Sequence, residues 1–93
     1  MIEIMRFRLS PDCDEAAFLL ADKKVQEEFA YAQAGLQRRT TARGQDGNWV
    51  VIDLWRSAED ADACDVLWDS DPIAQHFMSF VDHVSVKRYQ QLS

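Results

Sequence analysis

His76 is the residue of this chain best suited to acid–base chemistry. Imidazole titrates near neutral pH and binds metals, so a histidine beside a ligand can act as a general base or an axial ligand. His76 follows Ile73 by three residues and precedes Phe77, so it borders the apolar stripe of an expected helix. The alternative is a rim histidine that is hydrogen-bonded to a neighbour. The second histidine, His83, stands beside Asp82 at an expected helix-to-strand junction, where a capping or turn role is typical.

Trp68 is the second candidate catalytic residue, because an indole ring stacks well on planar molecules. Large aromatic residues at helical spacing are usually core residues, and packing in a core is compatible with lining a pocket. Asp53 is an acidic residue within an apolar stretch, and it needs a partner if it is buried. An ion pair with Arg6 or Arg8 is the structural alternative to a catalytic acid.

No established metal-binding or nucleotide-binding motif accompanies these residues. Cys13 and Cys64 lie far apart in the sequence and form no C-x-x-C pair, so neither a zinc site nor a disulfide framework is indicated. Glycine occurs only at positions 35, 44 and 47, which excludes a phosphate-cradling loop of the nucleotide-binding form. The sequence therefore predicts no metal site and no cofactor.

The charge of the chain is acidic and unevenly distributed. Asp and Glu number 16 against 10 Lys and Arg, for a net charge of −6. The whole excess lies in residues 57–71, which we interpret as a solvated helix face. A nucleic-acid-binding protein needs a basic surface, so we exclude that class. Because the sequence shows neither a membrane-spanning apolar run nor a secretion signal, we expect a cytoplasmic protein without membrane contact.

Hydrophobic periodicity predicts the elements that must position these residues. Alternating patterns predict strands at residues 2–9, 36–43, 48–55 and 83–89. A first helix is expected from Asp14 to about Ala34, ending at Gly35. A second helical region follows a cap at Ser57 and restarts at Pro72, where the missing N–H of proline does no harm.

The resulting order, β-α-β-β-α-β, is that of the split βαβ or ferredoxin-like unit. We therefore predict a single α+β domain over residues 1–93. Its four-stranded antiparallel sheet would carry two helices on one face.

The strand at 48–55 is apolar on both sides and therefore needs two covers. The side that we assign to the helices carries Val50, Ile52 and Leu54. The opposite side would leave more apolar surface in water than a monomer usually exposes. We therefore predict a homodimer that packs sheet against sheet, with Trp49, Asp53 and Trp55 in the interface.

The sequence also resembles a known superfamily. A stretch ending in A-x-A-G-L is followed by a polar strand, a turn, W-V-V-I-D-L-W-R-S-A-E-D-A-D-A and then S-D-P-I-A-Q-H-F. This arrangement resembles the dimeric α+β barrel superfamily, and within it the antibiotic-biosynthesis-monooxygenase-like proteins. The resemblance covers nearly the full chain in element order. Members include cofactor-independent quinone-forming monooxygenases, haem-degrading monooxygenases and small isomerases, so the resemblance implies a fold and a dimer more than a reaction.

The resemblance also implies a pocket between the sheet and the helices of the same subunit. Its wall would include Phe7, Phe18, Phe29, Trp68, His76 and Phe77. The haem-degrading members carry a Trp and then a His in the second helical region, and Trp68 and His76 are rough matches. Those members also place an Asn on the first strand, where this chain has Phe7.

Three functions are compatible with these observations. The first is a cofactor-independent oxygenase or isomerase acting on an aromatic or polyketide-like molecule, with His76 in proton transfer and Trp68 shaping the site. The second is a non-catalytic dimeric module that binds a small apolar or aromatic ligand or has a structural role. The third is a haem-binding or haem-degrading monooxygenase.

Overall fold

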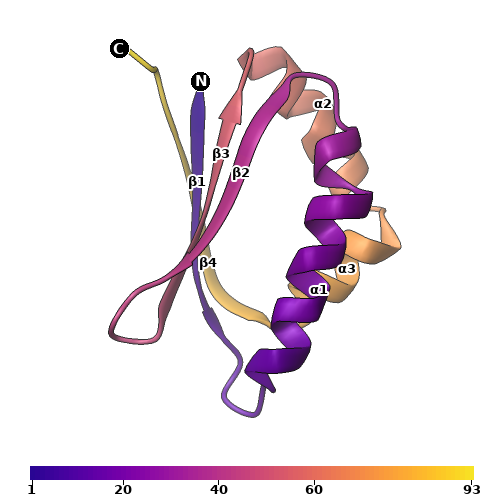
Figure 1. The fold of residues 1–93 in the computed structure, drawn as a ribbon, viewed down its shortest axis with the longest axis vertical. Helices are drawn as coiled ribbons and strands as arrows, with labels where there is room; N and C mark the ends of the chain where they lie inside the picture. The colour runs from indigo at the N-terminus through magenta and orange to yellow at the C-terminus, as the bar shows by residue number, and fades with distance from the viewer.

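A computed structural model describes all 93 residues and shows a four-stranded sheet with every helix on one face (Figure 1). The strands are β1 (Ile2–Leu9), β2 (Leu36–Arg43), β3 (Asn48–Trp55) and β4 (Val81–Tyr89). The helices are α1 (Glu15–Glu28), the short 3-10 turn η1 (Ala30–Ala32), α2 (Ala58–Trp68) and α3 (Pro72–Met78). All strand pairs are antiparallel in the order β2-β3-β1-β4, which confirms the ferredoxin-like prediction. No helix has the length and apolarity that crossing a membrane requires.

Side-chain caps start the helices of the second helical region. The Ser57 hydroxyl accepts a hydrogen bond from the Asp60 backbone N–H at the start of α2, and the Asp71 carboxylate does the same for Ile73 at the start of α3. The first helical region is shorter than predicted, since α1 ends at Glu28. Gly35 then reverses the chain with a φ of +84°, a conformation that glycine adopts without strain.

The pairing of β1 with β3 shows which side of β3 faces the helices, and the side assigned from the sequence is wrong. Phe7 pairs with Trp49, so the tryptophan side of β3 shares the helix-covered face with Phe7. Trp49 and Trp55 are 6% and 3% exposed within one chain, whereas Ile52 on the other side is 37% exposed. Trp49, Asp53 and Trp55 therefore face the helices and not a second subunit.

A cluster of aromatic rings explains this orientation of β3. The Phe18 ring on α1 lies 5.1 Å from the Trp49 ring and 5.3 Å from the Phe77 ring, measured between centroids. Phe18 and Phe77 are fully buried. A tryptophan removes more apolar area from water than Val50 or Ile52, so turning the tryptophan side inward is the more stabilising choice.

The opposite face of the sheet carries no helix (Figure 1). By the pairing of β1 and β3, its aliphatic residues are Ile2, Ile4, Val50, Ile52 and Leu54. Four of these side chains are only partly buried, and Ile52 is exposed. This face is therefore the one that lacks a cover within the chain.

Candidate functional site

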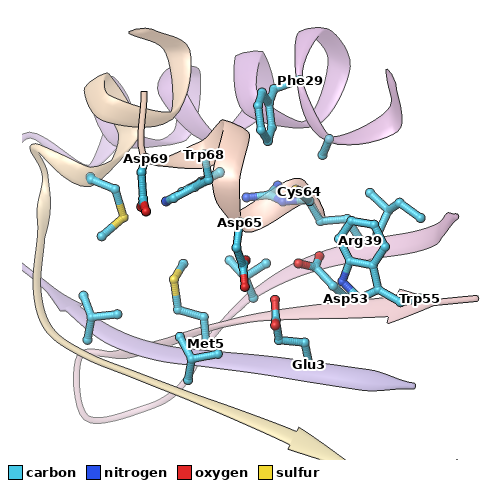
Figure 2. A pocket seen from close by; sticks show the side chains of 16 residues that line it. Glu3, Met5, Phe29, Arg39, Asp53, Trp55, Cys64, Asp65, Trp68 and Asp69 are labelled. Atoms are coloured by element: carbon cyan, nitrogen blue, oxygen red, sulfur yellow. The ribbon is translucent and has the colours of Figure 1, made fainter. Parts of the chain in front are cut away.

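A cavity of about 360 Å³ lies between the sheet and the helical layer, at the end of the sheet where β1 begins and β3 ends (Figure 2). Ligand pockets in proteins typically span roughly 300–1,000 Å³, so this volume suits a small molecule. Aromatic rings of the wall belong to Phe29, Trp55 and Trp68. Val84 and Val86 of β4 line the cavity while remaining 41% and 53% exposed, so the cavity is accessible along this edge strand.

Five charged side chains belong to this mostly apolar lining. They are Glu3, Arg39, Asp53, Asp65 and Asp69. Figure 2 shows the carboxylates of Glu3, Asp53 and Asp65 directed toward a common region, the first two from the sheet and the third from α2. Four of the charged lining residues are acids and one is a cation.

Arg88 on β4 partners two of these acids. Its guanidinium contacts the Glu3 carboxylate at 2.8 Å and the Asp65 carboxylate at 3.0 Å, and it also binds Asp62 at 2.6 Å. Hydrogen bonds to Asp62 and Glu3 raise the pKa of Arg88, so its charge is permanent. Burial raises the pKa of Asp65 against the opposing effect of Arg88.

Arg39, the only cation that lines the cavity, is bonded to groups away from it. Its guanidinium donates to the Asp22 carboxylate at 2.8 Å and to the Gln26 and Thr41 side-chain oxygens at 3.3 Å. The Thr41 hydroxyl donates to the same Asp22 oxygen at 2.9 Å. The Asp22–Arg39 pair is thus a satisfied structural network of α1 and β2.

Asp53 and Trp55 carry the two buried side-chain polar atoms that no protein group satisfies. These atoms are Asp53 Oδ1 and Trp55 Nε1. Burial raises the pKa of Asp53 to about 7, with Arg39 opposing the rise and Glu3, Asp65 and Asp22 adding to it. The Asp53 carboxyl group can therefore gain and lose a proton near neutral pH, which is the property of a general acid or base.

Cys64 also lines the cavity, but its thiol is protonated at neutral pH and is therefore a poor nucleophile. Burial, with smaller contributions from Asp65, Asp53 and Glu3, raises the pKa of its thiol to about 12. A thiolate is the reactive form of cysteine, and at neutral pH this side chain is a thiol.

Of the two predicted catalytic residues, only Trp68 lines the cavity. His76 is exposed on α3, and its ring packs against Phe80 with centroids 5.2 Å apart. His83 is exposed within β4 and not at a junction; its φ of +54° coincides with a β-bulge in the pairing with β1. The catalytic role of His76 stays a prediction, and the geometry gives it no contact with the cavity.

Of the four phenylalanines that were expected to line the pocket, one lines this cavity and three do not. Phe29 lines the cavity, and its ring lies 5.5 Å from that of Trp68. Phe7, Phe18 and Phe77 are buried in the aromatic core instead, so the expectation that they line a pocket does not hold for this cavity. The core rings fill the space between α1 and the sheet, and the cavity is left on the α2 side.

Asp53 and Trp55 were not identified from the sequence as cavity residues. Two signals could have found them: Asp53 is the only charged residue of its strand, and a spacing of two puts Trp55 on the same side. The same two signals are also typical of a dimer interface, and the sequence alone does not show which side of the strand faces the helices.

Comparison with known proteins gives the fold and no closer relationship. No family model and no curated protein matches the sequence. A variant of SnoaB, a cofactor-independent oxygenase from Streptomyces nogalater, superposes with a TM-score of 0.78 at 18% identity, over 98% of this chain and 93% of SnoaB. Rv0793 from Mycobacterium tuberculosis gives 0.73 at 20% identity, over 99% of this chain and 94% of Rv0793.

A third solved structure bears on self-association. A protein from an uncultured marine organism, described as a dimeric ferredoxin-like protein, superposes with a TM-score of 0.71 at 16% identity, over 99% of this chain and 94% of its own. At such identities the likeness concerns the fold alone. The four-stranded sheet, its strand order and these superpositions together show that this chain has the ferredoxin-like fold of these proteins.

Proposed function

We propose that this chain is a small cofactor-independent oxygenase whose substrate is an aromatic molecule bound in the cavity between the sheet and the helices. The observation that carries the proposal is the cavity itself, in which aromatic walls adjoin the unpartnered Asp53 carboxylate. Apolar walls can hold a ring, and a few polar atoms can orient it. The likeness in fold to SnoaB supports the reaction class.

The proposed reaction needs no group beyond the substrate, O₂ and the protein. An electron-rich ring that has lost a proton can itself reduce O₂. When a ring CH₂ becomes a carbonyl, one oxygen atom of O₂ enters the product and the other leaves as water with both hydrogens. The protein has to exclude bulk water, hold the ring and accept the first proton.

Oxygen uptake with hydroxylated naphthacenes and quinols tests this function. We expect uptake above the rate without protein, and we expect it to fall in Cys64→Phe, which fills the cavity from α2. Ala63→Phe is the matched control, since Ala63 is the exposed neighbour of Cys64. Uptake no faster than the uncatalysed rate with every compound would sink the oxygenase proposal, and binding without uptake would indicate a non-catalytic binding module.

The role predicted for His76 has its own test in the same assay. His76→Ala should slow uptake if this imidazole takes part in proton transfer. Uptake equal to that of the unchanged protein removes His76 from the mechanism.

The haem-dependent alternative finds little support in the residues of the cavity. Haem iron is usually held by His, Cys, Met or Tyr. Both histidines lie outside the cavity lining, no tyrosine lines it, and the Cys64 thiol is protonated at neutral pH. Met5 and Met78 do line the cavity, but methionine usually holds haem iron together with a histidine. The cavity therefore lacks the histidine that most often holds haem iron.

We also propose that the protein acts in the cytoplasm as a homodimer that joins the two uncovered sheet faces. The aliphatic residues on that face support this arrangement, because contact between two copies would remove them from water. Ile52→Glu should produce monomers in sedimentation velocity, because it places a charge at the centre of the face. Leu20→Glu on α1 is the control, since Leu20 is 71% exposed on the opposite layer. An unchanged dimer for Ile52→Glu would contradict the proposal.

A further inference from the structure

We propose that the cavity selects a neutral aromatic ligand with a phenolic or enolic hydroxyl, that Asp53 is the base that accepts the hydroxyl proton, and that the Trp55 indole N–H binds an oxygen of the ligand. The proton-transfer part rests on the proposed oxygenase function, whereas the binding part does not. Asp53 is then a catalytic residue and Trp55 a specificity-determining one.

The two unsatisfied atoms carry this inference because they are an acceptor and a donor on two residues that line one cavity. Asp53 Oδ1 is an acceptor, Trp55 Nε1 is a donor, and both are buried without a protein partner. Their residues stand two apart on β3, on the side that lines the cavity, and Figure 2 shows the indole ring beside the Asp53 carboxylate. An unpaired buried polar atom destabilises a protein, so a ligand that pairs both atoms gains that free energy on binding.

The surrounding charges decide the charge of the ligand. Glu3 on β1, Asp65 on α2 and Asp22 on α1 all act on Asp53 as like charges, and Arg39 on β2 is the opposing charge. The guanidinium of Arg39 already binds Asp22, and that of Arg88 binds Glu3 and Asp65. No cation is left to receive an anionic ligand, so a carboxylate-bearing molecule is repelled and a neutral one is accepted.

Proton transfer in this site also follows from the burial of Asp53. The ligand O–H bond breaks, a bond forms between the proton and Asp53 Oδ1, and the electron pair stays on the ligand oxygen, whose new charge the Trp55 N–H stabilises. A phenol with a pKa of about 10 would give up its proton to an ordinary carboxylate with an equilibrium constant of roughly 10⁻⁶. Because burial raises the pKa of Asp53 to about 7, the constant becomes roughly 10⁻³.

Four naphthalene probes separate the two contacts. Naphthalene has no polar atom, 1-methoxynaphthalene has an acceptor only, 1-naphthol has a donor and an acceptor, and 1-naphthoate is an anion. By calorimetric titration at about pH 8, where Asp53 is mostly ionised, we expect 1-naphthol to bind about tenfold more tightly than 1-methoxynaphthalene and that compound more tightly than naphthalene. We expect 1-naphthoate to bind most weakly.

Two variants assign each preference to one residue. Asp53→Leu should abolish the advantage of 1-naphthol over 1-methoxynaphthalene, and Trp55→Phe should abolish the advantage of 1-methoxynaphthalene over naphthalene. Asp69→Asn is the control for charge, since Asp69 lines the same cavity but is exposed. It should leave both preferences intact, whereas Asp53→Asn should improve 1-naphthoate binding.

The outcomes distinguish this inference from the oxygenase proposal. Equal affinities of the unchanged protein for 1-naphthol and 1-methoxynaphthalene would overturn the ligand assignment, whatever the oxygen uptake, and this comparison needs no variant to fold. The predicted preferences without any uptake would leave the binding assignment standing and remove the oxygenase. With uptake, Asp53→Asn should lower its rate about 10²- to 10⁴-fold and abolish the rise in rate near pH 7; an unchanged rate and pH profile would exclude Asp53 as the base.

Discussion

Asp22 and Asp53 are two acids near the same arginine, and their surroundings differ in one respect. The Asp22 carboxylate receives hydrogen bonds from Arg39 and Thr41 at 2.8 and 2.9 Å, and the residue is 8% exposed. Asp53 is less buried as a residue, but its Oδ1 atom is shut off from solvent and receives no hydrogen bond. A buried carboxylate with partners holds a fold together, whereas one without partners destabilises it and is available to a ligand.

The amount by which Asp53 destabilises the folded protein depends on pH. Its pKa rises from 3.8 in the unfolded chain to about 7 in the fold, so the folded state favours the protonated form. The native protein therefore has its full stability below pH 3.8 as far as this group is concerned, and loses about 4 kcal/mol as pH rises through 7. Sites that serve function rather than stability show this kind of loss.

The largest expected change in stability concerns Asp22, the acid that receives hydrogen bonds. Asp22→Asn should lower the free energy of unfolding by about 3–5 kcal/mol, because it leaves the buried Arg39 charge uncompensated. Urea unfolding at neutral pH measures this change. Glu15→Gln is the control, because its ion pair with Arg43 is exposed and should contribute less than about 1 kcal/mol. Similar losses in both variants would contradict the comparison.

Substitution of Asp53, the acid without a hydrogen-bond partner, should change the stability in the opposite direction. Asp53→Asn should stabilise the protein by up to about 4 kcal/mol at about pH 8, because the variant has no buried charge there. Near pH 4 both side chains are neutral in the fold and the gain should largely vanish. Urea unfolding across this pH range gives the difference curve. A gain that does not change with pH would show that the Asp53 charge is not the cause.

The smallest expected change in stability concerns the hydrogen-bonded hydroxyl group of Tyr31. The Tyr31 hydroxyl accepts from the Arg39 backbone N–H at 2.9 Å and donates to the Arg39 carbonyl at 3.3 Å. Tyr31→Phe should therefore lower the free energy of unfolding by about 1 kcal/mol. Tyr89→Phe, at an exposed tyrosine of β4, should change it little. A Tyr31→Phe variant as stable as the unchanged protein would show that this backbone contact is replaced by water without loss.

The sequence predicts the elements well because their signals are local. Ser57 and Pro72 mark helix starts through hydrogen-bonding groups and backbone geometry that act within a few residues. Gly35 marks the turn before β2, but α1 ends earlier, at Glu28. Alternation likewise predicts the extent of β3. These features do not depend on what the element later packs against.

The orientation of β3 could not be predicted in the same way. Its two sides are both apolar, so alternation separates them without ranking them. The choice depends on the pairing of Phe7 with Trp49 and on the fit of Phe18 against that tryptophan, which are contacts between distant segments. The candidate site cannot be placed from the sequence for this reason, since Asp53 and Trp55 line a cavity only if their side of β3 faces the helices.

Arg88 connects the two layers that enclose the cavity through ion pairs. It joins Glu3 in the sheet to Asp62 and Asp65 on α2, so it ties together the two layers that enclose the cavity. These bonds are partly exposed and dissolved salt screens them, whereas the contacts of Phe29 with Trp68 at the other wall are apolar and insensitive to it. We therefore expect high salt to weaken the connection between the two layers beside β4 and to leave the packing of the aromatic wall unchanged.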